Sequence, residues 1–229
     1  MIKNRTAQII YQTVYCTLGL VGFVACLGVF DDVANLRWDF YVHFTNLSNF
    51  LCIGVMFASL IQTVCKKEDS YVQTAPLMKF IGMLGILLTF LVFNLLLAGA
   101  EGRNPQLNWR VSSLTFHVVL PIMYIADWFL FYERKKAKWY YPIASIAFPL
   151  AYIIFIFIQA AILRFDTSIL IPGSTTPLIY PYFFVNLESQ GEAGVAKWIV
   201  ILLVVFVAVG YVFFGLDKLG KKKRMPEVP

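Results

Sequence analysis

The chain has 229 residues, of which 59% are hydrophobic and 14% charged, and its mean hydropathy is +0.72. A soluble domain averages roughly 45–50% apolar and about 25% charged residues. The composition therefore excludes an ordinary soluble enzyme, a disordered tail and a disulfide-stabilised secreted scaffold. The net charge of +6 could indicate a nucleic-acid partner, but the charges lie at the ends of hydrophobic segments.

A transmembrane helix needs about 20 predominantly apolar residues. The first apolar segment follows Lys3 and Arg5, as a signal peptide would, but it is too long for one and no small-residue cleavage site follows it. We therefore expect an all-α polytopic membrane protein with a single domain over 1–229. Its six predicted transmembrane helices cover about 9–30, 43–65, 77–100, 112–132, 142–163 and 196–216.

The basic residues divide unequally between the two sides of these spans. One side holds Lys3, Arg5, Lys66, Lys67, Lys79, Arg134, Lys135, Lys136, Lys138, Lys218, Lys221, Lys222, Lys223 and Arg224. The other side holds Arg37, Arg103, Arg110, Arg164 and Lys197. Cytoplasmic loops carry the excess of Lys and Arg, so both termini are predicted to be cytoplasmic. The basic tail is interpreted as a topology determinant resting on anionic lipid, and no nucleic-acid partner is expected.

Polar side chains are costly inside a membrane and tend to face the interior of the helix bundle. In the second span, helical spacing places Thr45, Ser48, Asn49 and Cys52 along one stripe. These residues could form a site, or Thr45 could cap the helix while the amide side chains bond helices together.

The fourth span contains His117, which is the only histidine well inside a predicted span. Pro121 lies four residues later and cannot donate a backbone hydrogen bond to the carbonyl of His117, so a bend and a pocket beside the imidazole are predicted. Tyr124 shares the face of His117, whereas Asp127 lies off it. The alternative is that His117 only makes a hydrogen bond between helices.

Three polar groups of different types are predicted to lie in one layer. Spans two and four both enter from the outer side, so Thr45 and His117 lie within about 9 Å of the outer boundary, and Asn94 late in the third span reaches the same depth. This set fits a nucleophile, a general base and an oxyanion donor. The sequence has no zinc spacing, phosphate-binding loop or G-x-S-x-G motif, so no metal or organic cofactor is expected.

Three short motifs occur in an order that resembles a known family. They are Phe44-Thr45-Asn46-Leu47-Ser48-Asn49, Phe116-His117-Val118-Val119-Leu120-Pro121 and Ile179-Tyr180-Pro181-Tyr182-Phe183. The pattern is similar to the androgen-induced-protein family of six-helix membrane proteins, and especially to its predicted bacterial relatives. The resemblance implies an intramembrane threonine hydrolase of fatty-acid esters, with Thr45 as nucleophile and His117 as catalytic histidine. The run after Thr45 and the long loop at about 164–195 depart from the animal members, which leaves the ester unidentified.

The sequence thus predicts an integral membrane hydrolase that cleaves a lipid or fatty-acid ester by attack of Thr45, with His117 as base. The resemblance further implies that its membrane is a bacterial plasma membrane. Substrate and oxyanion candidates are Asn49, Asn94, Ser48, Tyr124 and Tyr180. Acyl transfer, with Cys52 as a conceivable variant nucleophile, remains open. Two alternatives from other classes are a transporter or channel for a small solute or lipid, and a non-catalytic lipid-binding protein.

Overall fold

The computed structural model describes residues 2, 4–30, 39–65, 75–99, 105–163 and 177–219. This part of the chain is helical and contains no β-strand. It includes six helices that are long and apolar enough to cross a membrane, which confirms the predicted all-α multi-pass fold. The basic tail 220–229 and the first part of the loop 164–195, residues 164–176, lie outside the described residues.

The first three spans are α1 (Arg5–Cys26), α2 (Phe44–Cys65) and α3 (Pro76–Val92), which continues as η2 (Phe93–Leu97). The fourth span is composed of α4 (Val111–Leu114), η4 (Thr115–Val119) and α5 (Leu120–Leu130). The fifth comprises α6 (Tyr141–Ala144) and α7 (Ala147–Leu163), and the sixth is α8 (Leu187–Lys218). Short 3₁₀ segments are η1 (Asp39–Tyr41), η3 (Pro105–Trp109) and η5 (Phe183–Val185).

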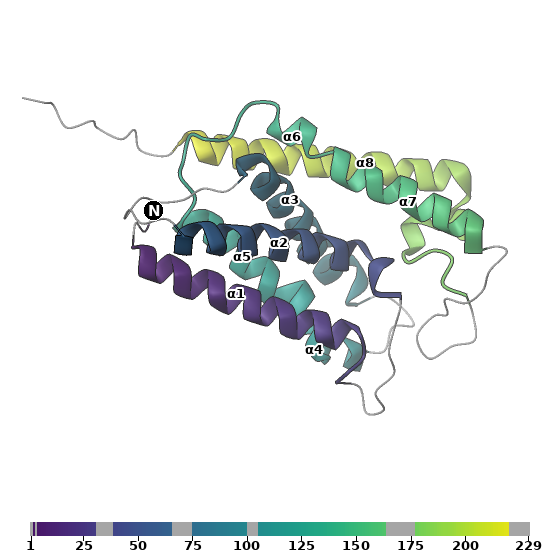
Figure 1. The fold of residues 1–229 in the computed structure, drawn as a ribbon. Helices are drawn as coiled ribbons and strands as arrows, with labels where there is room; N and C mark the ends of the chain where they lie inside the picture. Colours follow the sequence, from purple (N-terminus) through teal and green to yellow (C-terminus); the bar gives the residue numbers. More distant parts are fainter. Residues whose placement is uncertain are drawn as a thin grey trace, which may run out of the picture.

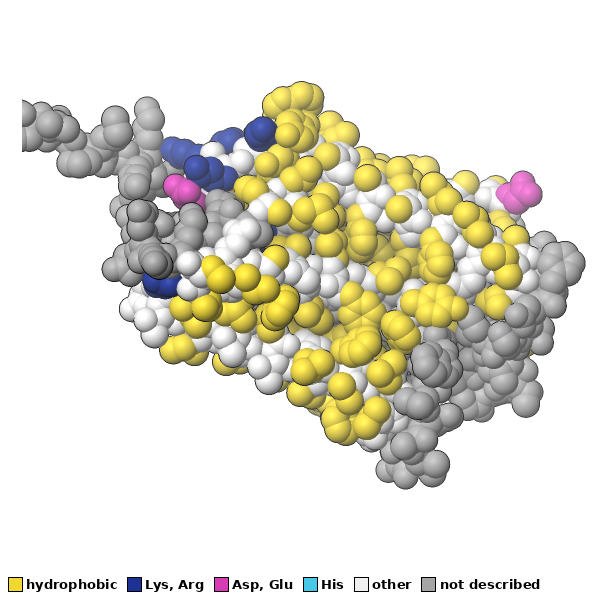
Figure 2. Space-filling view, in the orientation of Figure 1, with side chains coloured by type: hydrophobic (Ala, Val, Ile, Leu, Met, Phe, Trp, Pro, Cys, Tyr) yellow, Lys and Arg dark blue, Asp and Glu magenta, His cyan; other side chains and the backbone are white. Residues whose placement is uncertain are grey.

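The helices run up and down, and α3 lies between α7–α8 on one side and α1, α2 and α5 on the other (Figure 1). Helix α1 begins and α8 ends at the same end of the bundle, which we call the termini end. Figure 2 shows hydrophobic side chains over most of the visible face, with Lys and Arg gathered at the termini end. This is the surface expected of a bundle whose middle faces hydrocarbon.

Local capping explains where several helices begin. Asn4 accepts a hydrogen bond from the backbone N–H of Ala7 at 3.0 Å, so α1 starts four residues before the predicted span. Asn186 caps α8 in the same way. Within α8, Gly191 has a φ of 65° and a ψ of 170°, so the first turn is offset from the long membrane-crossing part.

Proline divides the fifth span, which was predicted to be one continuous helix. Pro149 has no N–H to donate to the carbonyl of Ser145, and α6 and α7 are separate at this point. The Ser145 hydroxyl is buried and donates to the carbonyl of Tyr141 at 2.7 Å, which stabilises the break.

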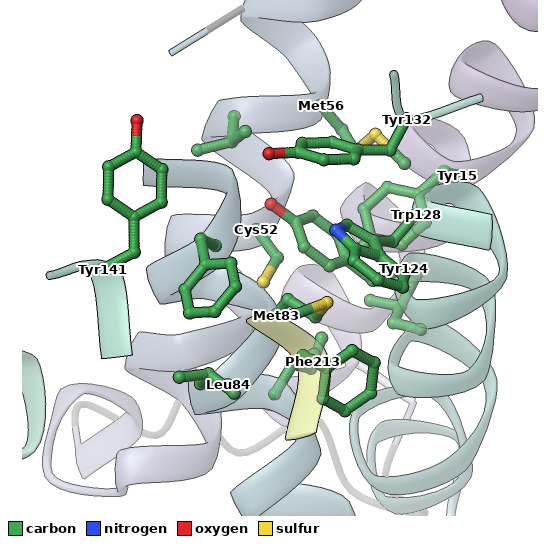
Figure 3. Close-up of a cluster of buried hydrophobic side chains, with 14 of the residues drawn as sticks. Tyr15, Cys52, Met56, Met83, Leu84, Tyr124, Trp128, Tyr132, Tyr141 and Phe213 are labelled. Carbon is green, nitrogen blue, oxygen red and sulfur yellow. The ribbon is translucent and has the colours of Figure 1, made fainter. Parts of the chain in front are cut away.

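The core in the half of the bundle toward the termini end is rich in aromatic and sulfur-containing side chains. Tyr15, Cys52, Tyr124 and Trp128 are fully buried there and point toward one another (Figure 3). The same region contains a buried ion pair between Lys79 of α3 and Asp127 of α5. This pair joins two helices about one turn from their ends at the termini end.

Candidate functional site

A largely apolar cavity lies between α2, α3, α7 and α8 in the half of the bundle opposite the termini end. The space among its lining residues, including its open mouth, is about 670 Å³. Its polar lining comes from four hydroxyl-bearing side chains, Thr45, Thr89, Tyr152 and Tyr182. The remaining lining residues are Phe44, Leu88, Val92, Phe93, Leu97, Pro149, Ile153, Phe184, Val185, Ile199, Leu202, Leu203 and Phe206.

A chain of hydroxyl groups fixes the Thr45 side chain at one end of this cavity. The Thr45 hydroxyl donates to the oxygen of Tyr182, and Tyr182 is hydrogen-bonded to Tyr152. The Tyr152 hydroxyl donates to the carbonyl of Val42 at 2.9 Å. The backbone N–H groups of Phe44 and Thr45, which have no acceptor within α2, lie near the same phenol oxygen.

The Tyr182 phenol lies in the segment before α8. Burial raises the pKa of Tyr182 above its ordinary value, and its hydrogen bonds with Thr45, Phe44 and Tyr152 offset only part of this effect. Tyr182 therefore stays a neutral phenol at physiological pH. Because the Tyr152 hydroxyl donates to Val42, the Tyr182 proton lies in the bond to Tyr152.

The third and fourth spans each contain a π-helical segment, η2 and η4, and η2 lines the cavity through Phe93 and Leu97. In η4 the N–H of Leu120 bonds to the carbonyl of Thr115, so the next donor in the π pattern would be that of Pro121, which has none. The carbonyl of Phe116 is left without a backbone donor for this reason. The predicted irregularity at Pro121 is thus a π turn, a class of distortion that is frequent at functional sites.

Two asparagine side chains satisfy the carbonyls next to Pro121. Asn49 donates to the carbonyl of Phe116 at 2.9 Å and to that of Thr45 at 2.8 Å. Asn94 donates to the carbonyl of His117 at 3.4 Å and to that of Phe90 at 2.8 Å. Both asparagines that the sequence suggested as oxyanion donors therefore use their side-chain N–H groups to link backbone carbonyls of neighbouring helices.

His117 is half-buried, and contacts on two sides fix the orientation of its imidazole ring. Its Nδ1 lies 3.0 Å from the carbonyl oxygen of Ser113 and 3.2 Å from the Ser113 hydroxyl. A carbonyl only accepts, so Nδ1 carries the proton and Nε2 is the proton-accepting nitrogen of the ring. The ring also stacks on Phe93, with centroids 3.6 Å apart and an interplanar angle of 15°.

Phe93 stands between the cavity and the histidine. It lines the cavity, as Thr45 does, whereas His117 is not among the lining residues. The described hydrogen bonds of the two predicted catalytic side chains lead to different partners, Tyr182 for Thr45 and Ser113 for His117. Their backbones are joined through Asn49, which bonds Thr45 and the residue before His117. In this structure Thr45 therefore lines the cavity directly, whereas His117 is linked to the cavity through the Phe93 ring on which it stacks.

The other predicted site residues lie at different places. Ser48 is buried, donates to the carbonyl of Thr45 at 3.0 Å and shares a hydrogen bond with Thr89 at 2.7 Å. Tyr124 lies deeper, beside Cys52 and Lys79 in the core, and not at the cavity. Tyr180 is partly buried and packs against the hydrophobic cluster that includes Phe184 and Val185 of η5.

Sequence reasoning did not single out Tyr152, Tyr182 or Phe93 as site residues. Tyr182 belongs to the motif Ile179-Tyr180-Pro181-Tyr182-Phe183, but that motif offered two tyrosines without a periodicity to choose between them. Tyr152 of α7 and Phe93 of η2 lie in predominantly apolar spans, where an aromatic residue carries no signal of a site.

Among the described residues no group of three or more His, Cys, Asp or Glu side chains could hold a metal ion. The arrangement is one of hydroxyl groups at an apolar cavity, with an imidazole stacked on one of the lining rings; such a cavity can bind an acyl chain and position an oxygen nucleophile next to it. Compared with models of protein families, with curated proteins and with solved structures, the chain has no match.

Proposed function

We propose that the protein is an intramembrane ester hydrolase that binds the acyl chain of a lipid or fatty-acid ester in the cavity and cleaves the ester with Thr45. The observation that carries this proposal is the position of the Thr45 hydroxyl, at the polar end of an otherwise apolar cavity. The buried hydroxyl is held by Tyr182 rather than exposed to lipid. The resemblance to the androgen-induced-protein family points to the same activity and to the same threonine.

In the proposed reaction, Oγ of Thr45 attacks the ester carbonyl while its proton passes to Nε2 of His117. The tetrahedral intermediate collapses, the alcohol leaves with the proton returned by His117, and an acyl-Thr45 ester remains. Water then attacks this ester with His117 again as base, which releases the fatty acid and restores Thr45. The neutral phenol of Tyr182 turns its proton from Tyr152 to the oxyanion, and one such donor is worth roughly 3–4 kcal/mol of the barrier.

Proton transfer requires the Phe93 side chain to turn away from the imidazole. Its ring is the one that both lines the cavity and stacks on His117. We propose that an acyl chain entering the cavity displaces this ring and brings His117 into contact with Thr45. The structure then corresponds to the resting state of the enzyme, with the catalytic pair separated.

The test is active-site labelling of the purified protein with a fluorophosphonate probe, which reacts with activated hydroxyl nucleophiles. Thr45→Ala should abolish labelling and His117→Gln should lower its rate at least about tenfold, as expected for loss of a general base. Thr63→Ala is the matched control, since Thr63 is a buried threonine of the same helix whose hydroxyl bonds to the carbonyl of Ser59. Unchanged labelling of Thr45→Ala would disprove the nucleophile.

A second candidate function is non-catalytic binding of lipid, which is favoured by one observation: His117 does not line the cavity. In that case neither the wild type nor any variant should react with the probe. Fatty acids should nevertheless raise the unfolding temperature of wild type and of Thr45→Ala equally.

A further inference from the structure

We infer that Phe206 of α8 forms the floor of the cavity and limits the length of the acyl chain that the protein accepts. The inference rests on the proposed function for the orientation of the chain, with its carbonyl at Thr45 and its methyl end toward Phe206. Phe206 is thus a specificity-determining residue, and the substrate property that it selects is the length of the acyl chain.

The lining residues of α8 follow a single stripe along the helix. Ile199, Leu202, Leu203 and Phe206 are spaced i, i+3, i+4 and i+7, so they lie on one face over about 10 Å of helix. On the antiparallel α3 and η2, the lining runs from Leu97 to Leu88, about 13 Å. The cavity is therefore elongated along the helices, as a single extended acyl chain requires.

The cavity closes directly beyond Phe206, where α8 meets its neighbours. A Cβ at Gly210 would lie 2.9 Å from Cβ of Pro142 in α6 and 3.1 Å from Cδ1 of Leu84 in α3. This close approach leaves no space between the three elements one turn below Phe206. Phe206 is itself only 3% exposed, and it is the last side chain of α8 that reaches the cavity.

The distribution of polar groups gives the chain a direction. The Thr45, Tyr152 and Tyr182 hydroxyls form one hydrogen-bonded group. The remaining polar lining residue, Thr89, is bonded to Ser48 of α2 at 2.7 Å, so its hydroxyl is already satisfied. Around Phe206 the lining consists of apolar side chains such as Leu88 and Leu203. A carboxyl or ester group therefore fits only at the Thr45 end, and a hydrocarbon end fits at the floor.

The test compares saturated fatty acids from hexanoic to stearic acid for the increase in unfolding temperature that each produces in the purified protein. In Phe206→Ala the best-binding acid should be longer by about two to four carbons, because removing the ring leaves a cavity at the floor. In Leu203→Trp, where a larger side chain fills the cavity, the best acid should be shorter. Phe213→Ala is the matched control: Phe213 is buried two turns further along α8 and does not line the cavity.

A length profile that is the same in wild type, Phe206→Ala and Leu203→Trp would overturn the inference. If Phe206→Ala does not fold, the shift toward shorter acids in Leu203→Trp decides the question alone. The p-nitrophenyl esters of the same acids separate this inference from the proposed function. A shift in the preferred acid length without Thr45-dependent cleavage of any ester supports the role of Phe206 and contradicts the hydrolase activity. Thr45-dependent cleavage with an unchanged length preference supports the hydrolase activity and contradicts the role of Phe206.

Discussion

Asn49 is the residue that connects the two predicted catalytic segments. Its amide donates to the carbonyls of Thr45 and Phe116, and it is fully buried between α2 and η4. The sequence could place Asn49 on the buried stripe of its helix, because the periodicity of that span is clear. It could not identify the partners, because the free carbonyl of Phe116 arises only from the π turn before Pro121.

Replacing Asn49 should therefore destabilise the fold through a specific partner. We expect Asn49→Leu to lower the free energy of unfolding by about 1–3 kcal/mol, because it leaves a buried carbonyl without a donor. In a Pro121→Ala background the loss should be smaller, since the new backbone N–H at position 121 can donate to that carbonyl. Thermal unfolding of the four proteins in one detergent measures this coupling, and strictly additive losses would contradict the assignment.

Helix α1 packs tightly against η4 at Gly22. A Cβ at Gly22 of α1 would lie 2.3 Å from Cε1 of Phe116 and 2.8 Å from Cγ2 of Thr115. Gly54 of α2, by contrast, has open space at the corresponding position, with no atom within 4 Å. The two glycines therefore have different reasons to be small.

We expect Gly22→Ala to destabilise the protein by about 1–3 kcal/mol, because the ring of Phe116 has to move. Gly54→Ala should stabilise it by about 0.5–1 kcal/mol, since alanine favours the helix and meets nothing. Unfolding temperatures of the two variants, measured side by side, check this pair. A stabilising Gly22→Ala would show that α1 and η4 are not packed as described.

The ion pair between Lys79 and Asp127 joins α3 to α5 in the core. The side chain of Lys79 is 4% exposed and that of Asp127 is fully buried. Either Lys79→Met or Asp127→Leu alone should lower the free energy of unfolding by about 3–5 kcal/mol, because the remaining charge is buried without its partner. The double variant should be more stable than either single variant. A double variant that is less stable than both would contradict a simple pairing.

At the level of the whole molecule, the hydropathy pattern predicted six helices, and the described residues contain six that can cross a membrane. The predicted ends were less accurate, since Asn4 starts α1 early and Pro149 interrupts the fifth span. The position of Tyr182 could not be predicted, because the path of the segment before α8 decides which tyrosine reaches Thr45. The stacking of His117 on Phe93 likewise depends on a rotamer of Phe93 that no sequence pattern specifies.

The distribution of charge gives the molecule a predicted orientation. The described cations at the termini end include Arg5, Arg134, Lys136 and Lys218, whereas Glu188 and Glu192 lie at the other end. We expect both termini to be cytoplasmic by the positive-inside rule. In a bacterial host, a C-terminal green fluorescent protein should fluoresce and a C-terminal alkaline phosphatase should be inactive. Active phosphatase would contradict the orientation and would place Thr45 in the cytoplasmic leaflet.

The central claim is that Thr45 is a nucleophile at the polar end of an acyl-binding cavity. The most direct measurement is tandem mass spectrometry of the fluorophosphonate-treated protein, which locates the covalent adduct on one residue. We expect a single phosphonylated site at Thr45 and its loss when a fatty acid that fits the cavity is present in excess. An adduct on another residue, or none under conditions in which the protein is folded, would contradict it.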